Sequence, residues 1–223
     1  MVTLVIETEE TLTSSVGLAG GTLPVRREDG AVQLPLVLPR QEKARWCWAA
    51  IGAGLARFLS GREISQSTLA TLTDDPGAPR SPPGSPPGSP EKSLHGLPPV
   101  SLSEADTGQD GTADGCNRPL DRVLDHLGLL AHWSPGKPRF ERLMFEINRG
   151  LPVPLRIEWF GGDAHFVLVT GYHPGDRSLL IDDSLHGPSR CPYDRFPREY
   201  RQGGVWTDTI WTRIHGDPSH GHL

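Results

Sequence analysis

The sequence predicts an α+β fold, with helices in the first half of the chain and an antiparallel sheet in the second. In the segments 117–127 and 140–147, apolar side chains recur at the three- and four-residue spacing of helices. From residue 153 onward, short apolar stretches alternate with Gly and Pro turns, as in consecutive strands. A Pro- and Gly-rich segment inside the helical half carries almost no large apolar side chains. The pattern therefore predicts one domain of two halves, interrupted by an insertion.

The helical half is expected to begin with a long buried helix. Segment 46–59 is rich in alanine and contains no proline, which favours a helix. Ser60 and Gly61 are expected to end it. A second, shorter helix is expected to run as far as Leu72, with Ser65 as its N-cap.

Two further helices and four strands complete the expected fold. The third helix should open at Asn117 and Pro119, because Asn caps helices well and Pro fits the first turn. The fourth should occupy 140–147 and end at Gly150. The expected strands are 153–159, 165–172, 178–183 and 205–214.

Composition excludes several classes of protein. Acidic residues outnumber basic ones by 27 to 22, whereas nucleic-acid-binding proteins usually present a basic face. No apolar run reaches the roughly 18 residues of a membrane helix, and the N-terminus lacks the features of a cleaved signal peptide. The cysteines, at 47, 116 and 191, are too widely spaced for a Cys-x-x-Cys zinc site or a disulfide-rich scaffold. We therefore expect no nucleic-acid or membrane partner, and a cytoplasmic location or export without a cleaved signal.

The insertion at 74–115 contains Ser-Pro-Pro-Gly twice and should be a solvated loop, because it cannot bury enough apolar area to become ordered. A tolerated surface insertion is the simpler interpretation, and a docking site for a partner is the alternative. The folded domain is expected to span 34–215. An N-terminal extension at 1–33 should precede it, and a flexible tail at 216–223 should follow it.

Cys47 is the first candidate for chemistry. It lies in the expected first turn of the long helix, where unpaired backbone N–H groups favour a thiolate over a thiol. A lone cysteine is also commonly a small buried apolar residue, so its position leaves both interpretations open. Trp46 and Trp48 flank it with bulky side chains of the kind that shape a cleft. Gln41, six residues upstream in an expected loop, is able to direct an amide N–H at a carbonyl oxygen under attack.

A histidine and two aspartates lie at the ends of expected strands. His165 opens an apolar strand after a double glycine, and Asp182 and Asp183 end the next strand. Taken singly, each is commonly structural, since strand-end aspartates usually serve turns. Together with Cys47 they supply a nucleophile, a base and a group that orients the base.

Strand geometry separates the two aspartates, because neighbouring side chains on a strand point to opposite faces. We expect Tyr172 to lie opposite Ser178 in an antiparallel hairpin. This register places Asp183 on the same face of the sheet as His165, within reach of it along a diagonal. A slip of one residue would favour Asp182 instead.

Three motifs combine in one chain: Gln41 with Cys47-Trp-Ala-Ala, His165 on a strand, and the turn Asp183-Ser-Leu-His-Gly. This combination resembles the papain-like cysteine proteases, most closely the compact bacterial branch of staphopain-like and avirulence-effector enzymes. The resemblance covers about 34–214, apart from the insertion. It implies a papain-like fold in which a buried helix of the helical half carries the cysteine and packs on the sheet half. It implies no metal and no organic cofactor.

The resemblance also implies a role for each residue. Cys47 would be the nucleophile and Gln41 the oxyanion donor. His165 would act as general base and then acid, oriented by Asp183. The implied activity is hydrolysis of peptide bonds in a protein or peptide substrate. Acyltransferases and deamidases share the same thioester chemistry, and a papain-like shell also serves as a non-catalytic binding module, so both alternatives stay open.

Overall fold

The computed structural model describes residues 22–72 and 119–214, and it confirms the predicted α+β class. The described helices are α1 (Cys47–Ser60), α2 (Gln66–Leu72), α3 (Leu120–His126) and α4 (Phe140–Asn148). The described strands are β1 (Val25–Arg26), β2 (Val32–Gln33), β3 (Leu130–Pro135), β4 (Val153–Trp159), β5 (Ala164–His173), β6 (Ser178–Asp182), β7 (Ser189–Pro192) and β8 (Gly204–Thr212).

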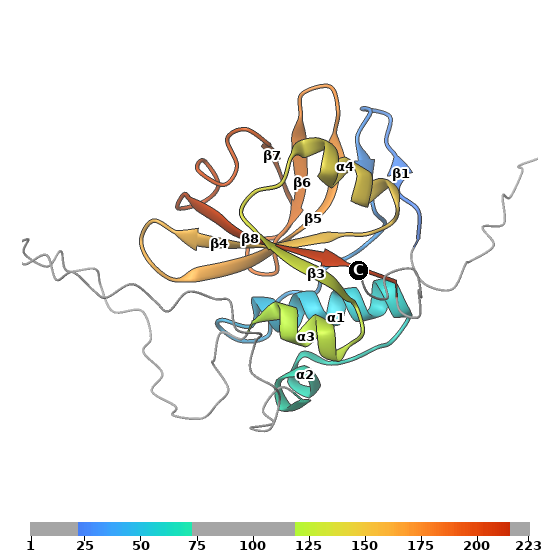
Figure 1. Ribbon diagram of the computed structural model, residues 1–223, viewed down its shortest axis with the longest axis vertical. Helices are drawn as coiled ribbons and strands as arrows, with labels where there is room; N and C mark the ends of the chain where they lie inside the picture. Colours follow the sequence, from blue (N-terminus) through green and yellow to red (C-terminus); the bar gives the residue numbers. More distant parts are fainter. Residues whose placement is uncertain (1–21, 73–118, 215–223) are drawn as a thin grey trace, which may run out of the picture.

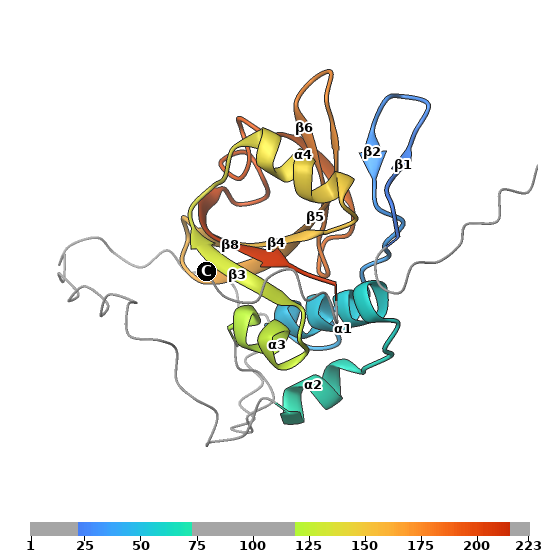
Figure 2. The ribbon, with the colours of Figure 1, turned by 45° about the vertical axis from the view of Figure 1, so that its right-hand side comes forward.

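The described strands form a single eight-stranded sheet in which every pairing is antiparallel. The order along the main path is β1-β2-β5-β4-β8-β3, and β6 joins β5 and carries β7. Helices α1, α2 and α3 lie together on one side of the sheet, and α4 lies on the other (Figures 1 and 2). Both α1 and α4 contact β5. Strand β5, which carries His165, is therefore buried along almost its whole length.

Helix α1 is the buried helix that the alanine-rich segment predicts. It ends where expected, because Gly61 adopts a left-handed conformation with φ 67° and its N–H bonds back to the last turn. The two tryptophans beside Cys47 differ from expectation, since Trp46 and Trp48 are each 1% exposed and belong to the hydrophobic core. Burying such large apolar side chains is strongly favourable. They therefore fix the start of the helix from inside and do not line an open surface.

The shorter helices begin and end close to the predicted residues. The Ser65 hydroxyl accepts a hydrogen bond from the Thr68 N–H at 3.0 Å, which confirms Ser65 as the N-cap of α2. Helix α3 begins at Leu120 with Pro119 at its N-cap, while the predicted cap Asn117 lies outside the described residues. Helix α4 is followed by Gly150 with φ 82°, as its sequence predicts.

The four predicted strands correspond to β4, β5, β6 and β8, whereas β1, β2, β3 and β7 are absent from the prediction. Strands β1 and β2 are two residues long, too short for a period of two to be recognised. Strand β3 is half-exposed and shows no clean alternation of buried and exposed side chains. Because β2 pairs with β5, the segment around residues 32–33 is part of the sheet.

The hairpin between β5 and β6 decides which aspartate faces His165. At the turn the predicted register is wrong by one residue, because Tyr172 lies opposite Leu179. A β-bulge between Val169 and Gly171 then shifts the register, so that Leu168 lies opposite Asp182. The register close to the site is therefore the one predicted. Gly171 is needed here because a Cβ would lie 2.5 Å from a β2 carbonyl oxygen.

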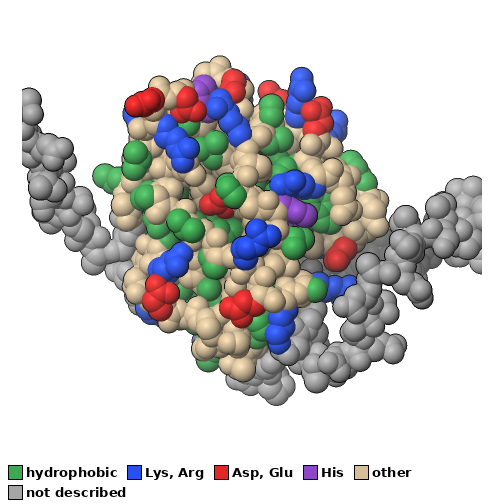
Figure 3. Space-filling view, turned by 180° about the vertical axis from the view of Figure 1, so that it is seen from behind, with side chains coloured by type: hydrophobic (Ala, Val, Ile, Leu, Met, Phe, Trp, Pro, Cys, Tyr) green, Lys and Arg blue, Asp and Glu red, His purple; other side chains and the backbone are tan. Residues whose placement is uncertain are grey.

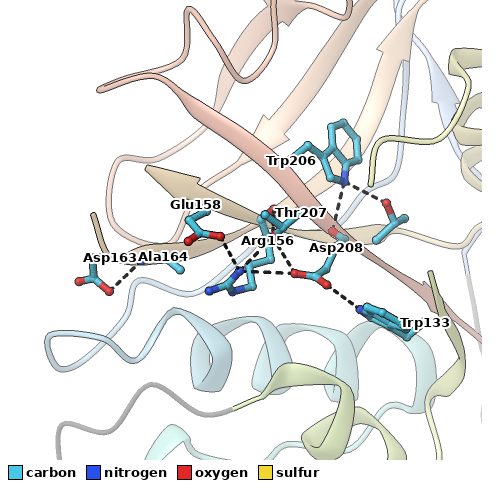
Figure 4. Close-up of polar contacts among 9 residues, drawn as sticks. Trp133, Arg156, Glu158, Asp163, Ala164, Trp206, Thr207 and Asp208 are labelled. Carbon is cyan, nitrogen blue, oxygen red and sulfur yellow. Dashed lines mark hydrogen bonds and ion pairs between the residues drawn. The ribbon is translucent and has the colours of Figure 1, made fainter. Parts of the chain in front are cut away.

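A polar network joins β3, β4 and β8 (Figure 4). Arg156 donates to the Thr207 hydroxyl at 3.0 Å and forms an ion pair with Asp208 at 3.6 Å. The indole N–H of Trp133 donates to the same carboxylate at 3.0 Å. Because these side chains are partly exposed, the network aligns the strands more than it stabilises them.

The predicted insertion at 74–115, with its suggested docking site, lies outside the described residues, as does the tail at 216–223. The domain boundaries therefore stay predictions. Within the described part of the chain, no helix has the length and apolar character needed to cross a bilayer. On the face shown in Figure 3, Lys and Arg side chains are interspersed with Asp and Glu.

Candidate active site

Cys47 is the first residue of α1, at the end where helices favour negative charge. Its N-cap is Trp46, whose indole is a hydrogen-bond donor only and is unable to cap the N–H groups of the first turn. The thiol lies in the protein interior, with 1% of the residue exposed. The structure therefore places the cysteine where its sequence predicts, at a helix start and shielded from bulk water.

His165 and Asp183 are in direct contact at the start of β5 and just beyond β6. The distance from His165 Nε2 to Asp183 Oδ1 is 2.8 Å, and both residues are buried. The same Oδ1 accepts the backbone N–H of Leu185 at 2.8 Å and that of His186 at 3.1 Å. The turn that begins at Asp183 therefore folds around its own carboxylate.

The charges of this pair support one another. Burial by itself raises the pKa of Asp183, but the hydrogen bond from His165 and those from Leu185 and Tyr200 outweigh it and hold the pKa at about 2. Burial by itself lowers the pKa of His165, but its hydrogen bonds to Asp183 and to Cys47 raise it to about 9. Because Nε2 faces the carboxylate, Nδ1 is the ring nitrogen left for the thiol.

Asp182 differs from its neighbour. Asp182 is the cross-strand partner of Leu168, so its side chain points to the face of the sheet opposite to that of Asp183. Burial raises the pKa of Asp182 to about 6. The predicted register favoured Asp183 as the partner of His165, and a slip of one residue would have favoured Asp182. The structure brings Asp183, and not Asp182, to the imidazole.

Gln41 is hydrogen-bonded to Ser184, the residue that follows Asp183. Its backbone N–H donates to the Ser184 carbonyl at 3.1 Å, and its side-chain Oε1 accepts the Ser184 hydroxyl at 3.1 Å. Its Nε2 donates one hydrogen to the Lys43 carbonyl at 3.0 Å. An amide nitrogen carries two hydrogens, so this bond uses half of its donor capacity. The loop before Cys47 is thereby fastened to the Asp183 turn.

The loops that precede Cys47 and His165 are joined on the surface. Arg45 and Asp163 each stand two residues before one of these side chains, and both have positive φ, at 64° and 69°. Such conformations are uncommon for residues other than glycine and cluster at functional sites. An ion pair of 4.0 Å between Arg45 Nε and Asp163 Oδ2 links the two loops.

Two residues of the site carry no signal in the sequence. The hydroxyl of Tyr200 donates to Asp183 Oδ2 at 2.8 Å, from an irregular segment between β7 and β8. The ring of Trp159 stacks on His165, with 6.1 Å between centroids. A pattern of apolar spacing identifies elements but not the partners of a carboxylate, so only the fold reveals these two.

Metal binding finds no support in the described ranges 22–72 and 119–214. No group of three or more His, Cys, Asp or Glu side chains is placed there to hold an ion.

No protein-family model matches the chain, and no curated protein is similar to it at a significant level. Eighteen chains of solved structures are similar to it. One is a double glycine motif protease from an AMS/PCAT transporter, solved in complex with the leader peptide; it is 16% identical with a TM-score of 0.44, over 86% of this chain and 98% of that one. At this distance the likeness assigns neither a family nor an activity.

Proposed function

We propose that this chain is a cysteine peptidase of the papain-like type, with Cys47 as nucleophile, His165 as general base and acid, and Asp183 as the group that orients the imidazole. One observation carries the proposal. A buried histidine is hydrogen-bonded to a carboxylate, and a cysteine at a helix N-terminus contributes to the raised pKa of its imidazole. This is the arrangement that activates a thiol for attack on a carbonyl carbon.

The acylation step follows from that geometry. The Cys47 thiolate attacks the carbonyl carbon of a peptide bond, and the oxygen becomes negatively charged. The Cys47 backbone N–H and the second Nε2 hydrogen of Gln41 are the proposed donors to that oxygen. His165 then gives its proton to the departing amine, the carbon–nitrogen bond breaks, and a thioester remains on the sulfur.

Deacylation reverses the role of the histidine. Neutral His165 removes a proton from water as the oxygen attacks the thioester, and the Cys47 thiolate leaves. The acid product departs, and the imidazolium beside the thiolate is restored. Asp183 stays ionised throughout, since its part is to fix the ring and to stabilise its positive charge.

The finer assignment also stays a proposal. The Gln41–Cys47 motif and the Asp183 turn resemble the compact bacterial branch of these proteases, and a protein or peptide is the substrate class that this branch implies.

The test is peptide cleavage followed by mass spectrometry, with the purified chain incubated with a diverse peptide library. Cys47→Ala should abolish cleavage. Cys191→Ala is the matched control, because it removes another buried thiol, and it should cleave like the wild-type protein. Cleavage that persists in Cys47→Ala would overturn the proposal. So would a wild-type protein that only deamidates side chains, that transfers acyl groups only to added amines, or that binds peptides without changing them.

A further inference from the structure

Four buried or half-buried side chains form a closed circuit around the base of the proposed site. His165 is bonded to Asp183, Asp183 to Tyr200, Tyr200 stacks on Trp159, and Trp159 stacks on His165. The two stacked contacts have centroid distances of 6.1 and 6.3 Å and interplanar angles of 22° and 21°. These values lie in the range of favourable offset stacking. Each member of the circuit therefore has two neighbours within it.

Tyr200 has a contact that nothing else in the circuit supplies. Asp183 Oδ1 accepts from His165 and from two backbone N–H groups, whereas Oδ2 accepts the Tyr200 hydroxyl at 2.8 Å. Rotation of a carboxylate about its last bond is soft and exchanges the two oxygens. A donor on Oδ2 opposes that rotation and so keeps Oδ1 directed at the imidazole.

Tyr200 is itself held firmly. Its ring lies 5.2 Å from that of Phe196, and only 4% of the residue is exposed. The carbonyl oxygen of Phe196 accepts a hydrogen bond of 2.9 Å from the Lys137 ammonium. This bond fastens the irregular segment to the residues that follow β3. A hydroxyl placed by so many contacts keeps its direction.

We propose that Tyr200 is a positioning residue for the His165–Asp183 pair: its hydroxyl locks the rotation of the Asp183 carboxylate, and Trp159 holds the tyrosine and imidazole rings parallel. The inference rests on the proposed function, because it assigns a part in the same site. Tyr200 touches neither the substrate nor the sulfur in this scheme and acts through Asp183.

Charged and titratable groups approach this carboxylate and the Tyr200 hydroxyl from several elements. Asp182 adjoins Asp183 in the chain, and the Arg201 guanidinium lies 5.2 Å from the centroid of the Tyr200 ring. His165 faces it from β5, with Cys47 of α1 beyond the imidazole. His186 lies on its own turn, with its ring 6.3 Å from that of His165. Tyr200 faces it from the segment before β8, and its pKa is raised to about 12, first by burial and then by the negative charge of Asp183. The hydroxyl is therefore a neutral donor at every pH at which the protein would work.

The other two of the chain's three tyrosines serve as matched controls, because their hydroxyls also donate a hydrogen bond. The Tyr172 hydroxyl donates to Asn148 Oδ1 at 2.9 Å, and the Tyr193 hydroxyl donates to the Pro138 carbonyl at 2.7 Å. Both bonds lie away from Asp183. Replacing each tyrosine by phenylalanine removes one hydroxyl and one hydrogen bond, and only Tyr200→Phe removes the donor to the carboxylate.

The experiment measures the rate of Cys47 alkylation by iodoacetamide against pH, over the range in which each variant stays folded by circular dichroism. Losing a hydrogen bond to a charged group raises the pKa of Asp183 and weakens its interaction with the imidazolium that pairs with the thiolate. The fall in alkylation rate at low pH (the acid limb) should therefore move to higher pH in Tyr200→Phe, by up to about one pH unit. Peptide turnover should fall about tenfold, while KM stays within about twofold. Tyr172→Phe and Tyr193→Phe should retain the wild-type acid limb. Superimposable profiles for wild type and Tyr200→Phe, or equal shifts in all three variants, would overturn the inference.

Two further variants keep the test decisive. If Tyr200→Phe does not fold, 3-fluorotyrosine incorporated into a Tyr172→Phe/Tyr193→Phe chain makes position 200 a stronger donor. The acid limb should then move to lower pH, and an unchanged limb would overturn the inference.

His165→Ala separates the two hypotheses. If it leaves the alkylation profile unchanged, the thiol–imidazole pair and the proposed function both fail. If it alters the profile and Tyr200→Phe does not, only the role of Tyr200 fails.

Discussion

Asp182 and Asp183 are chemically identical neighbours at the end of one strand, and their surroundings differ in almost every respect. Asp183 accepts hydrogen bonds from His165, from two backbone N–H groups and from Tyr200, and its pKa is held at about 2. Asp182 lies on the opposite face, and burial raises its pKa to about 6. The two pKa values move apart because one carboxylate accepts several hydrogen bonds, whereas burial alone acts on the other.

The comparison shows what qualifies a carboxylate to orient a base. Proximity in the sequence is not enough, because a step of one residue reverses the face of the sheet. A carboxylate that stabilises an imidazolium must stay ionised. This requires hydrogen-bond donors whose contribution offsets the cost of burying the charge. Asp183 meets both conditions.

The largest expected effect is on turnover when the favoured carboxylate loses its charge. Asp183→Asn should lower kcat by about 10³- to 10⁴-fold, because the imidazole loses its orientation and its counter-charge. Asp182→Asn should retain most of its turnover. Steady-state cleavage of one peptide by both purified variants measures the contrast. The reverse ranking in folded protein would transfer the orienting role to Asp182.

The second effect concerns the loop fastened to the Asp183 turn. Gln41→Ala should lower kcat by about 10²- to 10³-fold, the usual cost of one oxyanion donor. The melting temperature should fall only slightly, because the two side-chain hydrogen bonds that are lost lie at partly exposed positions. Gln66→Ala is the matched control. The Gln66 side chain is buried and bonds the backbone of Arg40 and Glu42, so its loss should lower the melting temperature. Unfolding of Gln41→Ala would make Gln41 a structural residue and contradict its assignment.

The third effect is on stability, and its sign should differ between the two aspartates. The pKa of Asp183 falls from about 3.9 in the unfolded chain to about 2, so it stabilises the fold above pH 4 and the benefit is lost as pH falls towards 2. The pKa of Asp182 rises to about 6, so burying its charged form destabilises the fold. This destabilisation is absent below pH 4 and complete above pH 6. Each effect is on the order of 2–3 kcal/mol.

Thermal unfolding at pH 7.5 should therefore separate the variants. Asp182→Asn should melt several degrees higher than the wild-type protein, and Asp183→Asn several degrees lower. At pH 4 the gain in Asp182→Asn should largely disappear. A destabilised Asp182→Asn at pH 7.5 would show that this carboxylate has donors that offset its burial.

The sequence predicted the elements that carry the site better than the contacts within it. Helix α1 and strand β5 are long and strongly patterned, so the positions of Cys47 and His165 followed from local rules. The hairpin register was predicted correctly near Asp183 only because the bulge beside Gly171 compensates for a turn that differs by one residue. The need for glycine at position 171 comes from the close approach of the β2 backbone, a tertiary contact that local sequence rules do not reveal.

Tyr200 marks the limit of such reasoning. Its segment between β7 and β8 has neither helical nor strand periodicity. The position of Tyr200 depends on Phe196 in the same segment, which is fastened in turn by the distant Lys137. The burial of Trp46 and Trp48 was missed for a similar reason. A sequence shows that an apolar side chain is large, and only packing decides whether it lines a surface or fills the core.

The central claim is that Asp183 and Cys47 hold His165 as an imidazolium, and nuclear magnetic resonance of ring nitrogens tests it most directly. The protein would be labelled with ¹⁵N-histidine, with the His165 signals assigned by comparison with His165→Gln and then followed from pH 5 to pH 10. The account predicts that both ring nitrogens stay protonated at neutral pH and that the ring titrates near pH 9. It also predicts a fall in that midpoint in Cys47→Ala. Titration of His165 near the ordinary value of about 6.5, unaffected by Cys47→Ala, would contradict the account.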